Sequence, residues 1–480
     1  MRAINISILN KLEKQTIVIL GFSRTGLSTY HFLRKHLPTK KLAIADKRSL
    51  DKMDPKIQQV IKKDQYLTTA FGSNYLKQID SYQLIFKSPG IPSSLSQIQK
   101  ALHKGSSLSS NTAIFMQIIN EWPDRENKPV IIGVTGTKGK STTTTLIYEM
   151  FKRAKHDAIL VGNIGIPPLS QIDQIKSKTK VIMELSSHQL AELKISPDIA
   201  VIQEITSEHL DYYASIKEYV EAKSSIARYQ KVDQYIIYNP LFKQTNEIAN
   251  LSKAKHLHYS LKATNDSICY INNDYLIYRD NKQNPEEIIK INNIKLRGKH
   301  NLYNIIPSVI IAKLFNIKTS IIANTLKKFQ HLAHRLELVR QINDITFIND
   351  SLATTVEATI NALQTYKQNN IILLAGGFDR KQDFSSLADQ ILVQNIKSLI
   401  LFPTTGERLL KVIKEKNKEK KQIDSQFVNS MEEAFNHIKK VAKPGDIVLL
   451  SPAAASFGLF KDYADRGNQF KKLVQEFNKA

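Results

Sequence analysis

The segment that most restricts the fold is a strand, a glycine-rich turn and a helix that follow one another near the middle of the chain. Residues 130–136 read VIIGVTG, an apolar run typical of a buried strand, and residues 133–145 read GVTGTKGKSTTTT. Gly136 and Gly139 allow close backbone approach, and the N–H groups at a helix N-terminus attract anionic oxygens. This order predicts a phosphate-binding loop.

Within this loop, Lys140 is placed to reach the β- and γ-phosphates of ATP, and Ser141 to bind Mg²⁺. Three further residues complete the predicted ATP-binding loop: Thr137, Lys138 and Thr142. The strict Walker A pattern requires glycine at the position of Thr135, so the loop departs from it. A purely structural turn is the alternative, but strand, glycines, Lys-Ser and helix occur in the expected order.

Short apolar runs alternate with helical stretches along the chain, which indicates α/β architecture with mostly parallel sheets. We expect a Rossmann-like domain at 1–119, a central P-loop ATPase domain at 120–331 and a second Rossmann-like domain at 332–480. Residues 258–294 alternate like antiparallel strands and predict a small subsidiary antiparallel sheet. The length alone also suggests about three domains.

Composition excludes several classes of protein. The 480 residues include one cysteine, Cys269, so no intramolecular disulfide and no cysteine-based metal cluster can form. The N-terminus lacks the pattern of a signal peptide and no long apolar run occurs, so we expect a cytoplasmic protein without a membrane span. The net charge of +24 is spread along the chain, and we interpret it as a basic surface that attracts small anions, not nucleic acid.

Three residues beyond the loop have the chemistry of a metal site. Glu184 ends the strand-like VIME, His209 follows the next strand in TSEHLDYY, and Lys223 lies in the helix-like EYVEAKSSI. A carboxylate at a strand's carboxyl end points into the crevice where open α/β sheets bind ligands. Taken singly, Glu184 could cap a helix, His209 could be an ordinary loop histidine and Lys223 could be a solvated helix lysine.

Together with the GTKGKST loop, these residues are similar to the Mur ligase superfamily, which builds the peptide stem of bacterial cell-wall precursors and includes the folylpolyglutamate synthases. The resemblance implies two Mg²⁺ ions, bound by Ser141, Glu184 and His209. It also implies that CO₂ carbamylates Lys223, which turns an ammonium into an anionic oxygen ligand suited to a hard cation. The implied catalytic set is Lys140, Glu184, His209 and Lys223, and Asn163 in VGNIGIP matches a position near the γ-phosphate.

The N-terminal block resembles the UDP-binding domain of the glutamate-adding, MurD-like branch of this family. GFSRTG at 21–26 is weak as a dinucleotide motif, because Ser23 replaces the middle glycine. A plain Rossmann turn is as good an interpretation of any single residue here. The resemblance assigns three segments to the UDP-sugar: Ser23, Arg24 and Thr25; Asp46, Lys47 and Arg48; and Ser88, Pro89 and Gly90.

Further matches continue in order toward the C-terminus. RGKHNLYN at 297–304 supplies Asn301 and Asn304, which in the family approach the nucleotide base. AHRLE at 333–337 supplies His334 and Arg335 for nucleotide or phosphate, and NDS at 349–351 supplies Asp350 for the ribose or a metal-bound water. The resemblance assigns the amino-acid substrate to Thr354, Arg380, Ser456 and Phe460.

The chain departs from the MurD-like pattern at three places. DSKATN becomes DSLATT at 350–355, GGxDK becomes GGFDR at 376–380, and SSFQ becomes SSHQ at 186–189. The guanidinium of Arg380 differs from an ammonium in geometry. These changes leave the enantiomer of glutamate open, with L-glutamate slightly favoured over D-glutamate.

The resemblance therefore implies an ADP-forming ligase of peptidoglycan synthesis, expected to be a monomer. It would activate the carboxylate of UDP-N-acetylmuramoyl-L-alanine as an acyl phosphate and join it to glutamate. One alternative is a folylpolyglutamate synthase-like ligase, against which the N-terminal domain argues, because in that family the ATPase domain comes first. The other is a non-ligase protein, either a P-loop nucleotide switch or a basic nucleic-acid-binding protein.

Overall fold

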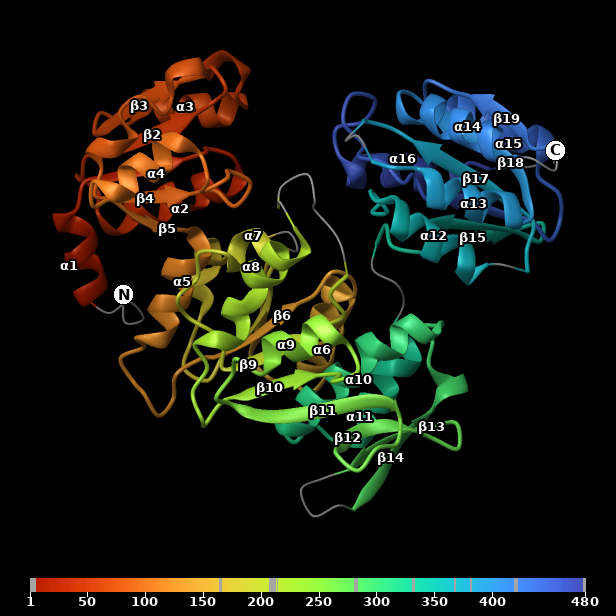
Figure 1. The fold of residues 1–480 in the computed structure, drawn as a ribbon, viewed down its shortest axis with the longest axis horizontal. Coiled ribbons are helices and arrows are strands. Elements are labelled where there is room, and N and C mark those ends of the chain that lie inside the picture. The colour runs from red at the N-terminus through yellow and green to blue at the C-terminus, as the bar shows by residue number, and fades with distance from the viewer. Residues whose placement is uncertain are drawn as a thin grey trace. The chain divides into compact units, whose positions relative to one another are not determined.

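The computed structural model describes residues 6–163, 166–206, 213, 215–279, 284–329, 333–366, 368–379, 382–417 and 422–477. The chain divides into two compact units, Met1–Lys328 and Phe329–Ala480 (Figure 1). Within the described residues, the strands of the first unit form sheets of five and nine strands, and those of the second unit form a sheet of six. The α/β architecture expected from the sequence is confirmed.

The five-stranded sheet is parallel throughout, in the order β3-β2-β1-β4-β5, and is red and orange in Figure 1. Every residue of β1 is buried, because α2 and α3 cover one face of the sheet and α4 covers the other. The elements of this region are α1 (Ile6–Lys14), β1 (Ile17–Leu20), α2 (Arg24–His36), β2 (Leu42–Asp46), α3 (Pro55–Lys63), β3 (Leu67–Phe71), β4 (Leu84–Lys87), α4 (Ser96–His103), β5 (Ser107–Ser109) and α5 (Asn111–Asn120).

The nine-stranded sheet has the order β14-β13-β12-β11-β10-β9-β6-β8-β7. β6 lies between β8 and β9, so the carboxyl ends of three parallel strands meet at one edge. α6 packs with α10 and α11, and α8 packs with α7 and α9. The elements are β6 (Val130–Thr135), α6 (Lys140–Arg153), β7 (Ala158–Gly162), β8 (Lys180–Glu184), α7 (Ser187–Leu190), β9 (Ile199–Ile202), α8 (Ile216–Arg228), β10 (Tyr235–Tyr238), α9 (Lys243–Ala249), β11 (Lys255–Lys262), β12 (Ser267–Asn272), β13 (Tyr275–Arg279), β14 (Pro285–Lys290), α10 (Lys299–Leu314) and α11 (Thr319–Lys328).

The antiparallel strands predicted at 258–294 extend the central sheet. β12, β13 and β14 pair antiparallel with one another, while β12 pairs parallel with β11. β10 pairs with the first half of β11, Lys255–His258, and β12 pairs with the second half, from His258 to Lys262. Alternation in the sequence indicates antiparallel strands, but it does not show which edge they join.

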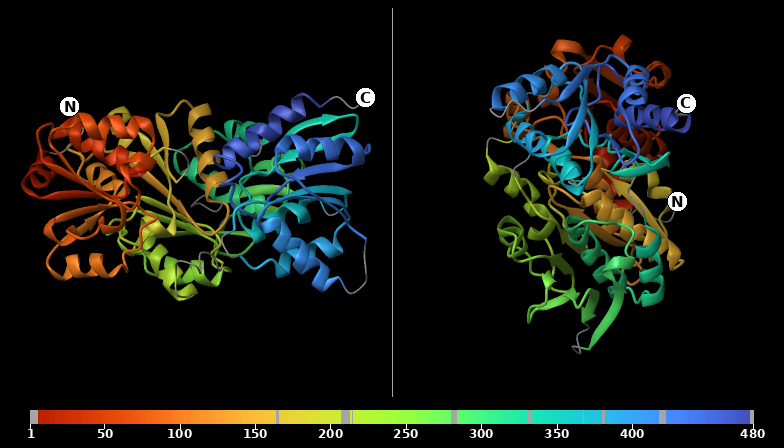
Figure 2. Two further views of the ribbon diagram at one scale, coloured as in Figure 1. Left: turned by 90° about the horizontal axis from the view of Figure 1, so that it is seen from above. Right: turned by 90° about the vertical axis from the view of Figure 1, so that its right-hand side faces the viewer.

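The six-stranded sheet of the second unit has the order β15-β16-β20-β17-β18-β19, and only β15 runs antiparallel among these strands. α12, α13 and α14 pack on one face, and α15 and α16 on the other, as Figure 2 shows for this unit. The elements are β15 (Glu337–Ile342), β16 (Ile345–Asn349), α12 (Val356–Thr365), β17 (Ile371–Gly376), α13 (Ser385–Val393), β18 (Ile396–Phe402), α14 (Thr405–Lys416), β19 (Asp424–Phe427), α15 (Met431–Val441), β20 (Ile447–Leu450) and α16 (Tyr463–Gln475).

The first predicted domain limit falls at the end of an element. Residue 119 lies in the last turn of α5, and the limit at 331 lies outside the described residues. The division into three domains therefore stays a prediction beside the two compact units. Among the described helices, none is both long and apolar enough to cross a lipid bilayer.

Candidate functional site

The predicted phosphate loop joins the carboxyl end of β6 to the first residue of α6, as the sequence indicates. Gly136 has φ +148° and Gly139 has φ +81°, a left-handed backbone that glycine adopts without strain. A Cβ added at Gly136 would lie 2.5 Å from Cβ of Gln203, and one added at Gly139 would lie 2.0 Å from Oδ1 of Asn304. Both glycines are therefore required by packing as well as by backbone conformation.

Asn304 connects the loop to α10. Its Nδ2 donates to Oδ1 of Asn301 at 3.1 Å, and Asn301 in turn donates to the Arg297 carbonyl at 2.6 Å. The Thr143 hydroxyl on α6 donates to the carbonyl of Asn304 at 3.2 Å. The structure thus brings Asn301 and Asn304 to the phosphate loop, although the two side chains are far from it in the sequence.

Gln203, which follows β9, is a residue that the sequence analysis missed. Its Nε2 donates to the Thr143 hydroxyl at 2.7 Å, and its Oε1 accepts from Tyr259 OH at 3.2 Å. Because its side chain also packs against Gly136, Gln203 holds the loop from the β9 side. The available signal was a polar residue directly after the apolar run IAVI, at the carboxyl end of a buried strand.

Glu184 is the last residue of β8 and is 1% exposed. Its Oε1 accepts a hydrogen bond from Nδ2 of Asn163 at 2.8 Å, so two predicted site residues meet here. Its Oε2 is buried and has no hydrogen-bond partner among the described residues. A buried carboxylate oxygen without a donor is costly unless a cation pairs with it, so this atom fits a ligand of Mg²⁺.

Two lysines converge on one carbonyl oxygen of the loop. Lys140 Nζ donates to the carbonyl of Gly136 at 2.9 Å and to that of Thr137 at 2.7 Å. Lys223, 1% exposed on α8, donates to the same Gly136 oxygen at 3.1 Å, and its Nζ lies 4.6 Å from the ring centre of Tyr219. The structure therefore brings Lys140 and Lys223 together at the loop that β6 presents.

The predicted metal set is only partly described. His209 lies outside the described residues, and Ser141 follows Lys140 in the first turn of α6. Among the described residues, no group of three His, Cys, Asp or Glu side chains gathers in a way that could hold a metal ion. Glu184 is a buried carboxylate that the neighbouring strand β8 brings beside β6.

The three segments assigned to the UDP-sugar meet at the carboxyl edge of the five-stranded sheet. Asp46 ends β2 and forms an ion pair with Arg48 at 2.9 Å, and its Oδ2 accepts from the N–H of Phe22 at 2.6 Å. Burial works against ionisation, but these hydrogen bonds prevail and lower the pKa of Asp46. The Ser88 hydroxyl donates to the Gly21 carbonyl at 2.8 Å. Four of the other assigned side chains are solvent-exposed: Ser23, Arg24, Lys47 and Arg48.

In the second unit, Asp350 directly follows β16 and is buried. Its carboxylate accepts from the N–H of Leu336 at 3.0 Å and from the Ser451 hydroxyl at 2.8 Å. Burial raises the pKa of Asp350 to about 7, although both hydrogen bonds act in the opposite direction. His334 and Leu336 have φ of +65° and +44°, a strained backbone for residues that are not glycine.

The residues assigned to the amino-acid substrate differ in how deeply they are buried. Ser456 and Phe460 are buried, and the Phe460 ring packs against Phe402 with ring centres 5.5 Å apart. Thr354 is half-buried, and Arg380 lies outside the described residues. In the arrangement seen, the Phe460 side chain belongs to the core, and its N–H donates to the Ser456 carbonyl at 3.1 Å.

Arg466 is a second residue that the sequence analysis missed. It is fully buried in α16, and it donates to the Ser351 carbonyl at 2.9 Å and to the Ala454 carbonyl at 3.1 Å. It therefore ties the NDS segment to the segment that leads to Ser456. Burial lowers the pKa of Arg466 to about 9. The signal was a basic residue near a helix N-terminus, where the macrodipole disfavours positive charge.

Comparison with known proteins places these features in one family. The model of the MurD-like N-terminal domain matches residues 15–110, that of the Mur ligase middle domain 134–312, and that of the glutamate ligase domain 334–454. A protein of Acetivibrio thermocellus named UDP-N-acetylmuramoylalanine--D-glutamate ligase is 33% identical over 470 residues, which cover 97% of this chain and 96% of that protein. This chain belongs to the Mur ligase family.

Members of this family are ATP-dependent ligases that form ADP, and this Mur ligase is such an enzyme. A protein of Clostridioides difficile with the same name as the Acetivibrio relative is 31% identical over 465 residues, covering 96% of this chain and 99% of its own length. The match to the MurD-like N-terminal domain also argues against the folylpolyglutamate synthase alternative.

Solved structures show the same fold. MurC from Thermotoga maritima has a TM-score of 0.56 at 15% identity and covers 96% of this chain and 99% of its own. MurF from Thermotoga maritima in complex with ADP has a TM-score of 0.55 at 16% identity, over 79% of this chain and 91% of its own. At these identities the likeness concerns the fold alone.

The packing of this Mur ligase's phosphate loop makes a testable prediction. Gly139→Ala should destabilise the first unit by about 1–3 kcal/mol, because the new Cβ meets Asn304 and the backbone is left-handed. Gly105→Ala is the matched control, since Gly105 has φ +96° with nothing within 4 Å of the added Cβ. Unfolding followed by fluorescence of Trp122, the single tryptophan, reports on this unit. Equal losses in both variants would contradict a role for the Asn304 contact.

The raised pKa of Asp350 predicts pH-dependent stability of the second unit. The folded state holds this proton up to about pH 7, whereas an unfolded aspartate releases it near pH 4. Stability should therefore be greatest below the unfolded pKa, fall between about pH 4 and pH 7 by up to about 1.4 kcal/mol per pH unit, and level off above pH 7. Asp350→Asn should flatten this dependence in the circular-dichroism transition and leave the Trp122 transition unchanged. A slope that survives in Asp350→Asn would refute the assignment.

Proposed function

We propose that this enzyme joins glutamate to UDP-N-acetylmuramoyl-L-alanine, with ATP converted to ADP and phosphate. The observation that carries the proposal is the edge of the central sheet, where the phosphate loop, Lys140, Lys223 and the buried carboxylate of Glu184 lie on neighbouring elements. The match to glutamate-adding relatives over almost the full length supports the choice of substrates.

The phosphate loop and its neighbours bind ATP. The N–H groups at the start of α6 and the ammonium of Lys140 would neutralise the phosphates, and the hydroxyl of Ser141 would serve as an Mg²⁺ ligand. Asn301 and Asn304 lie beside the loop and would face the nucleotide. Arg335 and Asp350 of the second unit would also contribute to the nucleotide. The other residues assigned to ATP are Gly136, Thr137, Lys138, Gly139, Thr142 and Asn163.

Two Mg²⁺ ions would be held by Ser141, Glu184, His209 and carbamylated Lys223. Bound there, the ions would neutralise charge on the transferred phosphate and on the acyl oxygen. Electrostatic repulsion favours carbamylation of Lys223. Two ammonium groups that share one carbonyl oxygen repel each other, whereas a carbamate on Lys223 would be an anion beside Lys140.

The reaction then needs little chemistry from side chains. The alanyl carboxylate oxygen attacks the γ-phosphorus, the bond to the β-γ bridging oxygen breaks, and ADP leaves. The glutamate amine attacks the carbonyl carbon of the acyl phosphate, loses a proton, and the tetrahedral intermediate expels inorganic phosphate to leave an amide. Catalysis rests on alignment of the carboxylate with the phosphate and on stabilisation of the charge that develops.

UDP-N-acetylmuramoyl-L-alanine, called the acceptor below, would bind at the edge of the five-stranded sheet, and glutamate would bind in the second unit. The UDP-sugar would be held by the three segments around Ser23, Asp46 and Ser88, with the guanidinium of Arg48 directed by Asp46. The amino acid would be held by the loops that carry Thr354, Arg380, Ser456 and Phe460. The departures in these loops slightly favoured L-glutamate, but the full-length relatives carry D-glutamate in their names, and we propose D-glutamate.

The metal assignment predicts that Glu184→Gln lowers turnover by about 10²–10³-fold, because the amide cannot supply an anionic ligand. Glu149→Gln is the control, since Glu149 lies on α6 in a half-exposed pair with Arg153. Steady-state ADP release with saturating substrates measures both. Turnover of Glu184→Gln near that of the unaltered enzyme would remove Glu184 from the site.

The substrate assignment predicts glutamate-dependent ADP release with UDP-N-acetylmuramoyl-L-alanine, and at least about tenfold higher kcat/KM for D- than for L-glutamate. Dihydropteroate and single-stranded nucleic acid serve as comparison substrates and should not stimulate ADP release. A preference for L-glutamate would overturn the enantiomer, and stimulation by nucleic acid alone would overturn the ligase.

A further inference from the structure

A buried ion pair joins the five-stranded sheet to the central sheet on the acceptor side of the site. Lys87 ends β4, its side chain is 1% exposed, and its Nζ lies 2.9 Å from Oε1 of Glu192. The Glu192 side chain is 14% exposed and also accepts from the Ser93 hydroxyl. No residue assigned to substrates or metal belongs to this pair.

Lys87 is placed to shape the turn that follows it. Its ammonium donates to the Ile91 carbonyl at 2.6 Å, and the N–H of Ile91 donates to the Ser88 carbonyl at 3.1 Å. The turn over Ser88–Ile91 therefore folds around the ammonium. This turn is the SPGI segment assigned to the UDP-sugar, and the Ser88 hydroxyl connects it to the Gly21 carbonyl.

Glu192 belongs to the segment that leads away from Glu184. The segment begins with a capping box, in which the side chains of Ser186 and Gln189 each bond to the backbone of the other. Nε2 of Gln189 donates to the Thr112 hydroxyl on α5 at 3.2 Å. A continuous run of short, fixed elements thus connects the carboxylate of Glu184 with that of Glu192.

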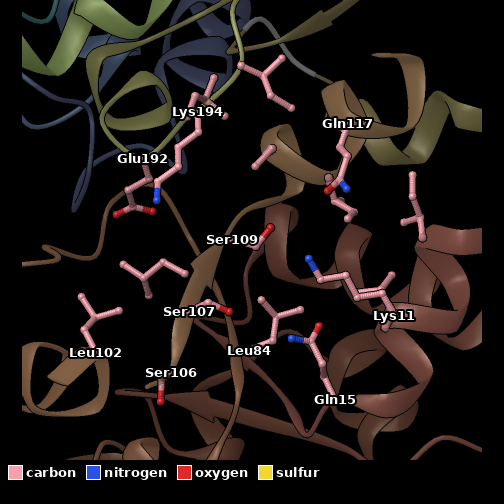
Figure 3. Close-up of a pocket in the computed structure, with 17 residues that line it drawn as sticks. Lys11, Gln15, Leu84, Leu102, Ser106, Ser107, Ser109, Gln117, Glu192 and Lys194 are labelled. Carbon is pink, nitrogen blue, oxygen red and sulfur yellow. The ribbon is translucent and has the colours of Figure 1, made fainter. Parts of the chain in front are cut away.

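Apolar packing alone does not fill the contact between these two regions. A cavity of about 580 Å³ lies between α1, β5 and α5 on one side and Glu192 to Ile195 on the other (Figure 3). Figure 3 shows Glu192 and Lys194 on one wall, with Ser107 and Ser109 of β5 below them. Glu192 lines this cavity, so its carboxylate lies where the packed part of the contact borders the hollow part.

We propose that Lys87 and Glu192 are positioning residues for the acceptor. The inference rests on the proposed function, in which one end of the acceptor binds at the SPGI turn and its carboxylate must reach the site beside Glu184. The ion pair fixes the distance between these two places. A buried pair suits this task, since removal of one partner leaves an uncompensated charge and no alternative pairing is as favourable.

The test is Glu192→Gln in the full chain, with steady-state kinetics for both substrates. KM for UDP-N-acetylmuramoyl-L-alanine should rise about tenfold, the cost of one partner lost from a buried pair that is partly compensated by the amide. KM for ATP should stay within about twofold, because the phosphate loop makes no contact with the pair. An unchanged acceptor KM, or equal rises for both substrates, would overturn the proposal.

The matched control is Asp173→Asn. Lys35 on α2 and Asp173 also link the two regions at 2.7 Å, but their side chains are 58% and 57% exposed. An exposed pair contributes little, so this variant should leave the acceptor KM within about twofold. A rise equal to that in Glu192→Gln would mean that any link between the regions suffices, and would overturn the role of the buried pair.

A double variant separates alignment from stability. In Lys87→Met/Glu192→Leu no charge is left uncompensated, so the unfolding temperature should recover relative to Glu192→Gln. The acceptor KM should stay raised, because the apolar side chains cannot hold the turn at the Ile91 carbonyl. Recovery of both quantities together would show that the pair is merely structural.

Amide hydrogen exchange keeps the inference testable if the proposed substrates prove wrong. In the enzyme without substrates, Glu192→Gln should speed exchange at Ile91 by about tenfold, and Asp173→Asn should not. Faster exchange in an enzyme that releases no ADP with the proposed substrates would sustain the ion pair and reject the proposed function. Unchanged exchange at Ile91 would overturn the ion pair whatever the activity.

Discussion

The approach of two side chains to the backbone of the phosphate loop is the constraint on which the site depends. A Cβ at position 136 would clash with Gln203, and a Cβ at position 139 would clash with Asn304. The Thr143 hydroxyl on α6 joins the two residues, because it accepts from the Gln203 side chain and donates to the main-chain carbonyl of Asn304. The loop is thus held from β9, from α10 and from its own helix, which fixes the N–H groups that an anionic phosphate needs.

Local patterns in the sequence predicted the fold well. The glycine-rich loop, the strands that carry Glu184 and Asp46 at their carboxyl ends, and the helix that carries Lys223 follow from apolar periodicity and from glycine positions. The pairing of β12 with β11 was not predictable, because alternation records the two faces of a strand and leaves its neighbour unspecified. His209 and Arg380 stay predictions, since both lie outside the described residues.

Residues whose roles depend on tertiary contacts were the hardest to predict from the sequence. Three cases bond to partners that are distant in the sequence: Arg466, Gln203 and the pair Lys87–Glu192. From the sequence alone, a single lysine or glutamate is interpreted as a solvated side chain. Their burial and their partners become visible only in the folded structure. Asp350 is a different case: the motif assigns it to a ligand, which stays a prediction, and the structure adds that its carboxyl group accepts hydrogen bonds from Leu336 and Ser451.

Charged groups from three elements, α6, α8 and β8, meet at the phosphate loop. Lys140 and Lys223 donate to one carbonyl oxygen, and Glu184 keeps an oxygen without a donor among the described residues. A buried carboxylate oxygen without a donor costs free energy in the protein alone, so this position is not optimised for stability. A bound Mg²⁺ would pair with that oxygen and would recover the cost of burial. Because Glu184 ends the strand next to β6, the sheet itself fixes the place where a phosphate and this cation would meet, before any side chain has to move.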